Sequence, residues 1–204
     1  MAGLRASQLL RAQLLDGVSL LLAGAVEPAP KQALGPAVAD AFASLGASVF
    51  EIPVRAREEQ ALDQAVGNAL AGTGRIDMLA VDCAGVFGEE LAEHGDSQRA
   101  LRGCVQSAWN ATRALANGAF LPSGAGGRVV YLAAPAGYDG AGALRAALEN
   151  LARTLSTEWA RHQLTTVTLA PAAEGAADEV AALVAYLASP AGAYFSGCVL
   201  EVGC

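Results

Sequence analysis

The chain has 204 residues, a length typical of a single domain. Hydrophobic residues make up 53% of it and charged residues 16%, so the composition excludes an intrinsically disordered chain. The formal net charge is −7, which offers no positive surface to the phosphates of nucleic acid or to anionic lipid heads. We therefore expect neither nucleic acid nor a membrane as a partner.

The sequence also argues against a membrane span and a signal peptide. An uncharged stretch over residues 180–200 is long enough to cross a bilayer, but Ser189-Pro190 and Ser196-Gly197 divide it into a helix and a strand. Arg5 and Arg11 interrupt the N-terminal leucines, and no small-residue cleavage site follows an apolar core. These features predict a cytoplasmic protein.

The four cysteines are Cys83, Cys104, Cys198 and Cys204. They show neither C-x-x-C spacing nor nearby histidines, so we expect no metal site. A reducing cytoplasm disfavours disulfides, and we interpret these thiols as small buried apolar side chains.

Short apolar runs between glycines and polar residues recur along the chain. The first, residues 18–23, lies between Asp16-Gly17 and Gly24, as expected of a strand buried on both faces of a parallel sheet. Six such runs predict six strands, at residues 18–23, 47–52, 76–81, 128–132, 165–170 and 198–202.

Helical segments separate these runs. The clearest spans residues 143–160, where leucines and Trp159 recur every three to four residues on one face. The predicted helices cover residues 34–45, 57–71, 98–116, 143–160 and 178–187. This alternation predicts an α/β fold, a single doubly wound, Rossmann-like parallel sheet of about six strands with helices on both faces.

Parallel sheets of this kind bind ligands beyond the carboxyl ends of their strands, at the switch point of the strand order. The segments expected at that edge are residues 24–35, 82–90, 133–142 and 171–177.

Two segments resemble the short-chain dehydrogenase/reductase family closely. Residues 74–85, GRIDMLAVDCAG, are similar to that family's G-R-I-D-x-L-V-N-N-A-G segment, and residues 145–160 resemble its catalytic helix. Residues 178–189 and 196–203 are similar to its penultimate helix and last strand. The resemblance implies a Rossmann-like family domain over residues 15–204, preceded by an N-terminal extension over residues 1–14.

The family's cofactor-binding turn is altered in this sequence. A T-G-x-x-x-G-x-G turn brings backbone N–H groups close to the pyrophosphate of NAD(P) at a helix N-terminus. Here residues 23–35, AGAVEPAPKQALG, are five residues longer, retain only Gly24 and Gly35, and include prolines and Glu27. Lys31 could contact a phosphate, although a solvated loop lysine is the simpler interpretation. We expect no cofactor binding by this chain.

The family's catalytic tetrad of Asn, Ser, Tyr and Lys is also replaced. Matching the motifs places Cys104, Ala134, Ala141 and Arg145 at these four positions. A methyl group cannot transfer a proton and arginine stays protonated, so this pairing excludes the family's acid–base chemistry. The resemblance therefore implies a degenerate, non-catalytic member that has no catalytic residues.

Three nearby polar residues have alternative interpretations. Tyr131 and Tyr138 could supply the missing phenol if the motif alignment shifts, but Tyr138 lies seven residues before Arg145, two helical turns away rather than one. Asp82 replaces the first Asn of the N-N-A-G turn. It is either near the path of the nicotinamide ribose or, more simply, a hydrogen-bonded turn aspartate.

Two connections are shorter than in the family. Six residues separate Pro171 from Asp178, where family members have a segment that folds over substrate. Residues 53–57 replace a helix and a strand that contact the adenosine half of the cofactor. We expect the substrate lid and the adenine-side unit to be missing.

The segments that still fit the family pattern are those from which its tetramers are assembled. The resemblance therefore implies an inactive subunit of a heteromeric complex such as a heterotetramer, bound to an active paralogue that holds NAD(P). Contacts are expected through residues 98–116 and 143–160, and through residues 178–187 with the last strand. Mixed assemblies of this family include hydroxyacyl-CoA dehydrogenases of toluene (benzylsuccinate) degradation, which suggests a pathway.

Two alternatives remain open from the sequence. One is an enzyme with an altered site, since halohydrin dehalogenases of this family use Ser, Tyr and Arg, and Arg145 supplies the last of these. Arg145 near a helix start is more simply a surface ion-pair residue. The other is a free-standing sensor that binds a small metabolite in the crevice at the switch point.

Overall fold

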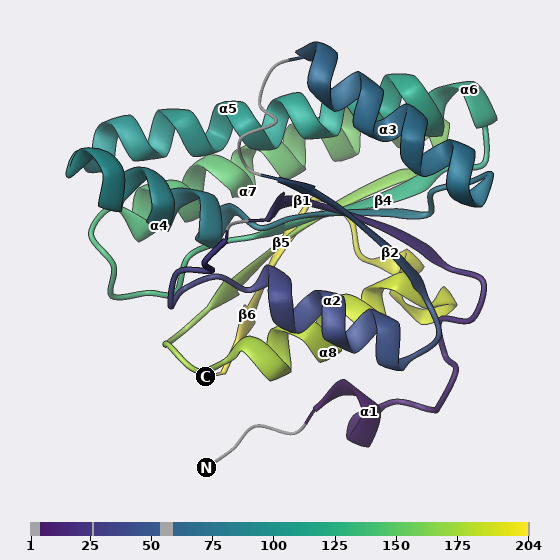
Figure 1. Cartoon of the computed structure of the whole chain (residues 1–204), viewed down its shortest axis with the longest axis horizontal. Helices are drawn as coiled ribbons and strands as arrows, with labels where there is room; N and C mark the ends of the chain where they lie inside the picture. The colour runs from purple at the N-terminus through teal and green to yellow at the C-terminus, as the bar shows by residue number, and fades with distance from the viewer. Residues whose placement is uncertain (1–4, 26, 54–58, 204) are drawn as a thin grey trace.

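The computed structural model describes residues 5–25, 27–53 and 59–203. One twisted parallel sheet lies between two layers of helices (Figure 1). Its six strands are in the order β2-β1-β3-β4-β5-β6. They are β1 (Ser19–Ala25), β2 (Ser48–Pro53), β3 (Met78–Val81), β4 (Gly127–Leu132), β5 (Leu164–Pro171) and β6 (Cys198–Val202). The predicted fold class and all six strands are confirmed.

The helices form one layer on each face of the sheet (Figure 1). One layer contains α3 (Glu59–Thr73), α4 (Cys83–His94), α5 (Ser97–Leu115) and α7 (Ala141–Glu158). The other contains α1 (Ala6–Leu9), α2 (Gly35–Ser44) and α8 (Ala177–Ala188). A short π-helix, η1 (Ala116–Phe120), and α6 (Leu121–Ser123) extend α5. Two 3-10 helices, η2 (Ala160–His162) and η3 (Pro190–Tyr194), follow α7 and α8.

The five predicted helices are present with small shifts at their ends. Residue 57, where the second was expected to begin, lies outside the described residues, as does most of the short connection expected at residues 53–57. The short connection after Pro171 is confirmed, because β5 ends at Pro171 and α8 begins at Ala177. Within the expected N-terminal extension, residues 1–14, the side chain of Ala6 in α1 is buried, and α1 contacts α8.

Helix α4 (Cys83–His94) was not predicted; residues 82–90 do follow β3 at the carboxyl edge of the sheet, as expected, and all but Asp82 belong to this helix. Gly85 and Gly88 lower its helix propensity and concealed it in the sequence. The helix is stable because its first six residues, 83–88, are all buried against the sheet and α5.

None of the helices within the described ranges is long and apolar enough to cross a membrane. Residues 180–200, the uncharged stretch, form the last turns of α8, η3 and the first half of β6.

The core between the sheet and α7 predicts a large stability effect at Leu148. Its side chain is 0% exposed, so we expect Leu148→Ala to lower the free energy of unfolding by about 2–5 kcal/mol through lost burial and a residual cavity. Leu9→Ala is a matched control, because Leu9 is 51% exposed and its truncation should change stability by about 0.5 kcal/mol or less. Urea unfolding of both variants measures the difference, and equal effects would contradict the packing described.

Candidate functional site

The carboxyl ends of β1 and β3 meet at the switch point of the strand order. The chain passes from β1 outward to β2 and then returns to β3, which pairs with the other side of β1. Ala23 lies opposite Val81, and the backbone N–H of Asp82 donates to the carbonyl oxygen of Ala23 at 2.8 Å. Gly24 and Asp82 therefore lie at the position where folds of this class bind ligands.

The Asp82 carboxylate accepts hydrogen bonds from the first amides of two helices. The N–H of Gly35 donates to Oδ2 at 2.8 Å, and the N–H of Leu34 is shared between Oδ1 and Oδ2 at 3.3 and 3.2 Å. The N–H of Gly85 donates to Oδ1 at 2.9 Å. Asp82 thus caps α4 and also holds the N-terminus of α2, because Gly35 lies 47 residues before Asp82 in the chain and is brought next to it by the fold.

This arrangement changes the binding chemistry of the N-terminus of α2. Such a terminus attracts anions because its first N–H groups have no partner within the helix. Here the N–H groups of Leu34 and Gly35 already donate to Asp82, and Pro36 has no N–H to offer. A carboxylate of the chain occupies the place where a phosphate group would bind.

The Asp82 side chain is buried, with 2% of its surface exposed. Burial raises the pKa of its carboxyl, and the hydrogen bonds from Gly85, Gly35 and Leu34 oppose part of that rise by stabilising the ionised form. Removing the carboxylate would leave three backbone N–H groups without their acceptor in a buried position.

Gly24 and Gly35, expected as remnants of a cofactor-binding turn, pack against this feature. A Cβ atom at Gly35 would lie 2.8 Å from Oδ2 of Asp82. Gly24 has a φ of +91°, and a Cβ there would lie 2.8 Å from Cγ2 of Val86 on α4. Both positions require glycine for the contact with β3 and α4, independently of any cofactor.

The loop before α2 packs on α4. The side chain of Gln32 lies directly over Gly88, so closely that a Cβ at Gly88 would collide with it. Lys31, the candidate phosphate ligand, is exposed on this loop, in agreement with a solvated lysine.

A cavity of about 510 Å³ lies beside this loop, between α2 and the carboxyl end of β2. Its lining includes the carboxyl groups of Glu27, Asp40, Glu51 and Asp82, and none of the described residues that line it is a lysine or arginine. An anionic dinucleotide would be repelled by this set of charges, so the described residues at this edge do not fit NAD(P).

The four positions matched to the catalytic tetrad include Ala134, just after the carboxyl end of β4, and Cys104, beside the first residue of α4, with Ala141 and Arg145 in the first turns of α7. Ala134 and Ala141 are buried, and the thiol of Cys104 donates to the carbonyl oxygen of Cys83 at 3.3 Å. Arg145 forms an ion pair with Glu201 on β6, as its interpretation as a surface ion-pair residue predicted. Burial raises the pKa of the Cys83 thiol well above its ordinary value, which makes this cysteine inert.

Phe87 on α4 fills the space beside these positions. Its side chain is fully buried, and a Cβ at Gly140 would lie 3.1 Å from its Cζ. Gly140 directly precedes Ala141, so an aromatic ring lies next to the turn that leads into α7. No local sequence pattern predicts this contact, because it depends on the unexpected helix α4.

Neither candidate tyrosine is placed for proton transfer. Tyr131 is fully buried in β4, its hydroxyl lies 2.9 Å from Oγ1 of Thr112, and burial raises its pKa. Tyr138 lies in the turn before α7, where a hydrogen bond to the Glu174 carboxylate raises its pKa. A general base that works near neutral pH needs a lowered phenol pKa, the opposite of both shifts.

No group of three His, Cys, Asp or Glu side chains in the described part of the chain is arranged to hold a metal ion. Cys83, Cys104 and Cys198 are free thiols.

Comparisons with known proteins identify relatives of this fold. A family model described as short chain dehydrogenase matches residues 24–180. No curated protein matches the chain at a significant level.

Among solved structures, a short chain dehydrogenase from Mycobacterium smegmatis has a TM-score of 0.76 and 20% identity, covering 100% of this chain and 98% of that one. A citronellol catabolism dehydrogenase from Pseudomonas aeruginosa has a TM-score of 0.71 and 23% identity, covering 95% of this chain and 96% of that one. A short-chain dehydrogenase/reductase from Serratia marcescens has a TM-score of 0.70 and 23% identity, with coverages of 92% and 96%. At these identities the likeness concerns the fold.

The hydrogen bonds of the buried Asp82 predict that its replacement lowers the free energy of unfolding more than the loss of an ordinary helix cap does. We expect Asp82→Ala to lower the free energy of unfolding by about 3–5 kcal/mol, because three buried N–H groups lose their acceptor. The matched control is Asp96→Ala, since Asp96 caps α5 through Gln98 and Arg99 at an exposed site and its loss should cost about 1 kcal/mol. Urea unfolding, analysed with a common m-value, compares the two variants. A loss of unfolding free energy in Asp82→Ala no larger than in Asp96→Ala would contradict the structural function of Asp82.

Proposed function

Because the chain belongs to the short-chain dehydrogenase family, we propose that it is a non-catalytic subunit that binds an active chain of the same family. Its contribution would be structural: it would add a rigid α/β partner surface to the complex. Cofactor binding and hydride transfer would occur in the partner.

The observation that carries this proposal is the Asp82 carboxylate at the N-terminus of α2. A dinucleotide needs the N–H groups of this helix start for its pyrophosphate, and here they donate to a buried side chain of the chain itself. Binding would require the phosphate to displace that carboxylate and to enter beside Glu27 and Glu51.

The residues at the catalytic positions support the same proposal. Ala134 and Ala141 have no group that can hold a proton, and Arg145 is engaged by Glu201. Phe87 packs against Gly140, the residue before Ala141. Restoring the chemistry would therefore take more than the replacement of single residues.

Two surfaces are suited to bind a partner. On α5, Trp109 is 36% exposed, and a partly exposed tryptophan is a common anchor of protein interfaces. At the sheet edge, β6 pairs only with β5 among the described strands, and its residues 198–200 are half-buried and apolar. An open edge strand of this kind is usually covered in the native assembly.

The alternatives have less support. An altered-site enzyme would need Arg145 free to act, but Glu201 neutralises it. A metabolite sensor would have to bind in the cavity beside Asp82, where the carboxyl groups of the described lining oppose an anionic metabolite. A hydroxyacyl-CoA substrate of the partner, and a pathway of aromatic degradation, stay predictions from the resemblance.

The acidic, internally capped switch point predicts that the isolated chain does not bind NADH. Calorimetric titration should give no saturable heat, corresponding to a dissociation constant weaker than about 1 mM. A family member with the glycine-rich turn intact serves as the positive control under the same conditions. Saturable binding in the micromolar range would contradict the proposal.

The partner itself is tested by purification of the tagged full chain from its native host. We expect native mass spectrometry to give a complex with a second family member whose sequence retains the Asn, Ser, Tyr and Lys positions. Trp109→Glu should reduce recovery of that chain about tenfold if α5 forms the interface, because a buried charge opposes docking.

Leu9→Glu is the control, since Leu9 is an exposed apolar residue on the other layer. Full recovery of the partner with Trp109→Glu would move the interface to β6, and a homo-oligomer that contains no second family member would overturn the proposed function.

A further inference from the structure

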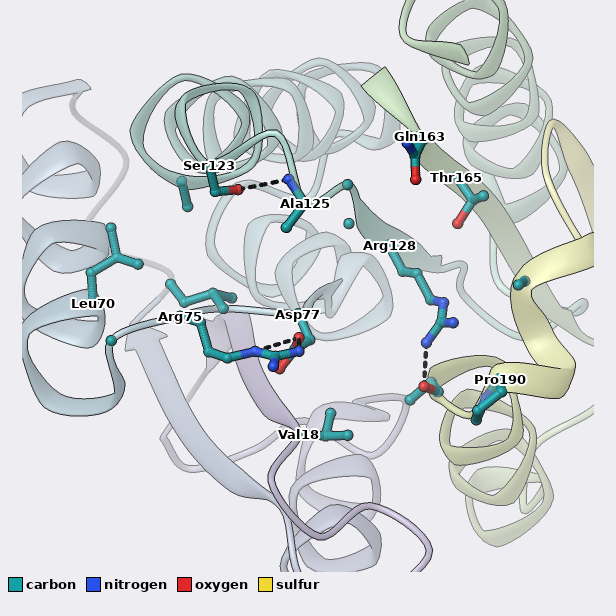
Figure 2. Close-up of a pocket in the computed structure, with 17 residues that line it drawn as sticks. Val18, Leu70, Arg75, Asp77, Ser123, Ala125, Arg128, Gln163, Thr165 and Pro190 are labelled. Carbon is teal, nitrogen blue, oxygen red and sulfur yellow. Dashed lines mark hydrogen bonds and ion pairs between the residues drawn. The ribbon is translucent and has the colours of Figure 1, made fainter. Parts of the chain in front are cut away.

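A second cavity, of about 650 Å³, lies at the amino ends of the strands, the edge of the sheet opposite the switch point (Figure 2). It is formed by the segments that enter β3, β4 and β5 at their amino ends, together with the C-terminal end of α8 and the start of η3. This edge is remote from the switch point, because all six strands run in the same direction. The cavity therefore belongs to neither the cofactor region nor the catalytic positions.

Arg128 provides the main charged group of this cavity. It is the second residue of β4, it is half-buried, and its side chain extends across the cavity toward Pro190 (Figure 2). Its Nη1 donates to the carbonyl oxygen of Ala188 at the end of α8. Burial lowers its pKa, with Asp77 opposing the shift, but a guanidinium stays protonated under ordinary conditions.

Most of the hydrogen-bonding capacity of Arg128 is unused within the described residues. A guanidinium has five N–H donors, and only Nη1 has a hydrogen-bond acceptor in the described chain. No ion pair joins Arg128 to a carboxylate among the described residues. The carboxylate in the lining, that of Asp77, binds elsewhere: Oδ1 accepts from Nε of Arg75 at 2.9 Å, and Oδ2 accepts from the N–H of Ser19 at 2.9 Å.

The local charge of the cavity is positive although the chain is acidic. Arg75 and Arg128 face it together with a single carboxylate, Asp77, which leaves one net positive charge in a chain of formal net charge −7. This contrasts with the carboxyl-edge cavity, where four carboxyl groups gather and the described lining contains no basic residue. Among the described residues, the two cavities therefore differ in the sign of their local charge.

The rest of the lining has polar and apolar parts. Ser123, Gln163 and Thr165 contribute hydroxyl and amide groups to the lining, while Val18, Leu70 and Ile76 contribute apolar surface. A volume of this size is typical of small-molecule sites, which combine an apolar lining with a few polar groups that orient the ligand.

We propose that this cavity binds a small amphipathic organic anion, with its carboxylate or phosphate group on Arg128 and its apolar part on Val18, Leu70 and Ile76. The anion accepts from the free N–H groups of the guanidinium, in the charge-assisted geometry that arginine forms with carboxylate and phosphate. The simpler function of Arg128, capping the last carbonyl groups of α8, uses one nitrogen and requires neither Arg75 nor the cavity.

The test uses the full chain and three probes: inorganic phosphate, acetate and hexanoate. Binding is followed by calorimetry and by the NMR shift of the Nε–H of Arg128. We expect saturable binding at millimolar concentrations, with hexanoate at least about tenfold tighter than acetate because its methylene groups are buried. Phosphate binding tighter than acetate would identify a phosphate head group, and the reverse would identify a carboxylate.

Three variants separate the site from nonspecific charge effects. Arg128→Gln should weaken binding at least about tenfold, and Ala125→Trp should abolish it, because a bulky side chain from a lining residue fills part of the cavity while every charge is retained. Arg153→Gln removes an exposed arginine on α7 outside the cavity and should leave binding unchanged.

Thermal unfolding accompanies each titration, because Arg128→Gln also removes the bond to Ala188; Ala125→Trp keeps that bond and tests the cavity alone. Equal binding by wild type, Arg128→Gln and Ala125→Trp, or no saturable binding of any of the three anions, would overturn the inference. Neither result bears on partner binding or on the NADH titration.

Discussion

The buried carboxylate of Asp82 connects more of this molecule than any other described polar side chain near the sheet edge. It joins the end of β3 to the starts of α2 and α4 through three backbone N–H groups. Because those groups have no other partner, the position of α2 over the sheet and the direction of α4 both depend on one side chain. A buried charge is tolerated at this point because its hydrogen bonds offset much of the cost of leaving water.

The same interaction determines what this edge of the sheet can bind. Helix N-termini attract anions, and a fold of this class normally uses that attraction for a ligand. Here the attraction is satisfied within the chain, and the adjoining cavity is lined with carboxyl groups. The fold of a cofactor-binding family is thus retained while the local chemistry opposes a dinucleotide, which is the physical basis of the proposed non-catalytic subunit.

Much of the candidate site could be anticipated from the sequence, but its organisation could not. The replacement of the tetrad residues and the altered turn at residues 23–35 are visible in the residues themselves. The capping function of Asp82 toward Gly85 has a local signal, an aspartate three residues before the glycine, at the start of a helix that was not anticipated. Its bonds to Leu34 and Gly35 have no such signal, because they join segments far apart in the chain.

The sequence by itself determined the six strands, the parallel sheet and five of the helices, because buried strands and amphipathic helices leave periodic patterns that depend only on neighbouring residues. Tertiary structure alone decided that residues 83–94 form α4, since packing of its first turns compensates for two glycines. It also decided that Phe87 lies beside Gly140, and that Arg75 and Arg128 share one cavity. These features depend on strand order and helix packing, which bring together residues that no local pattern relates.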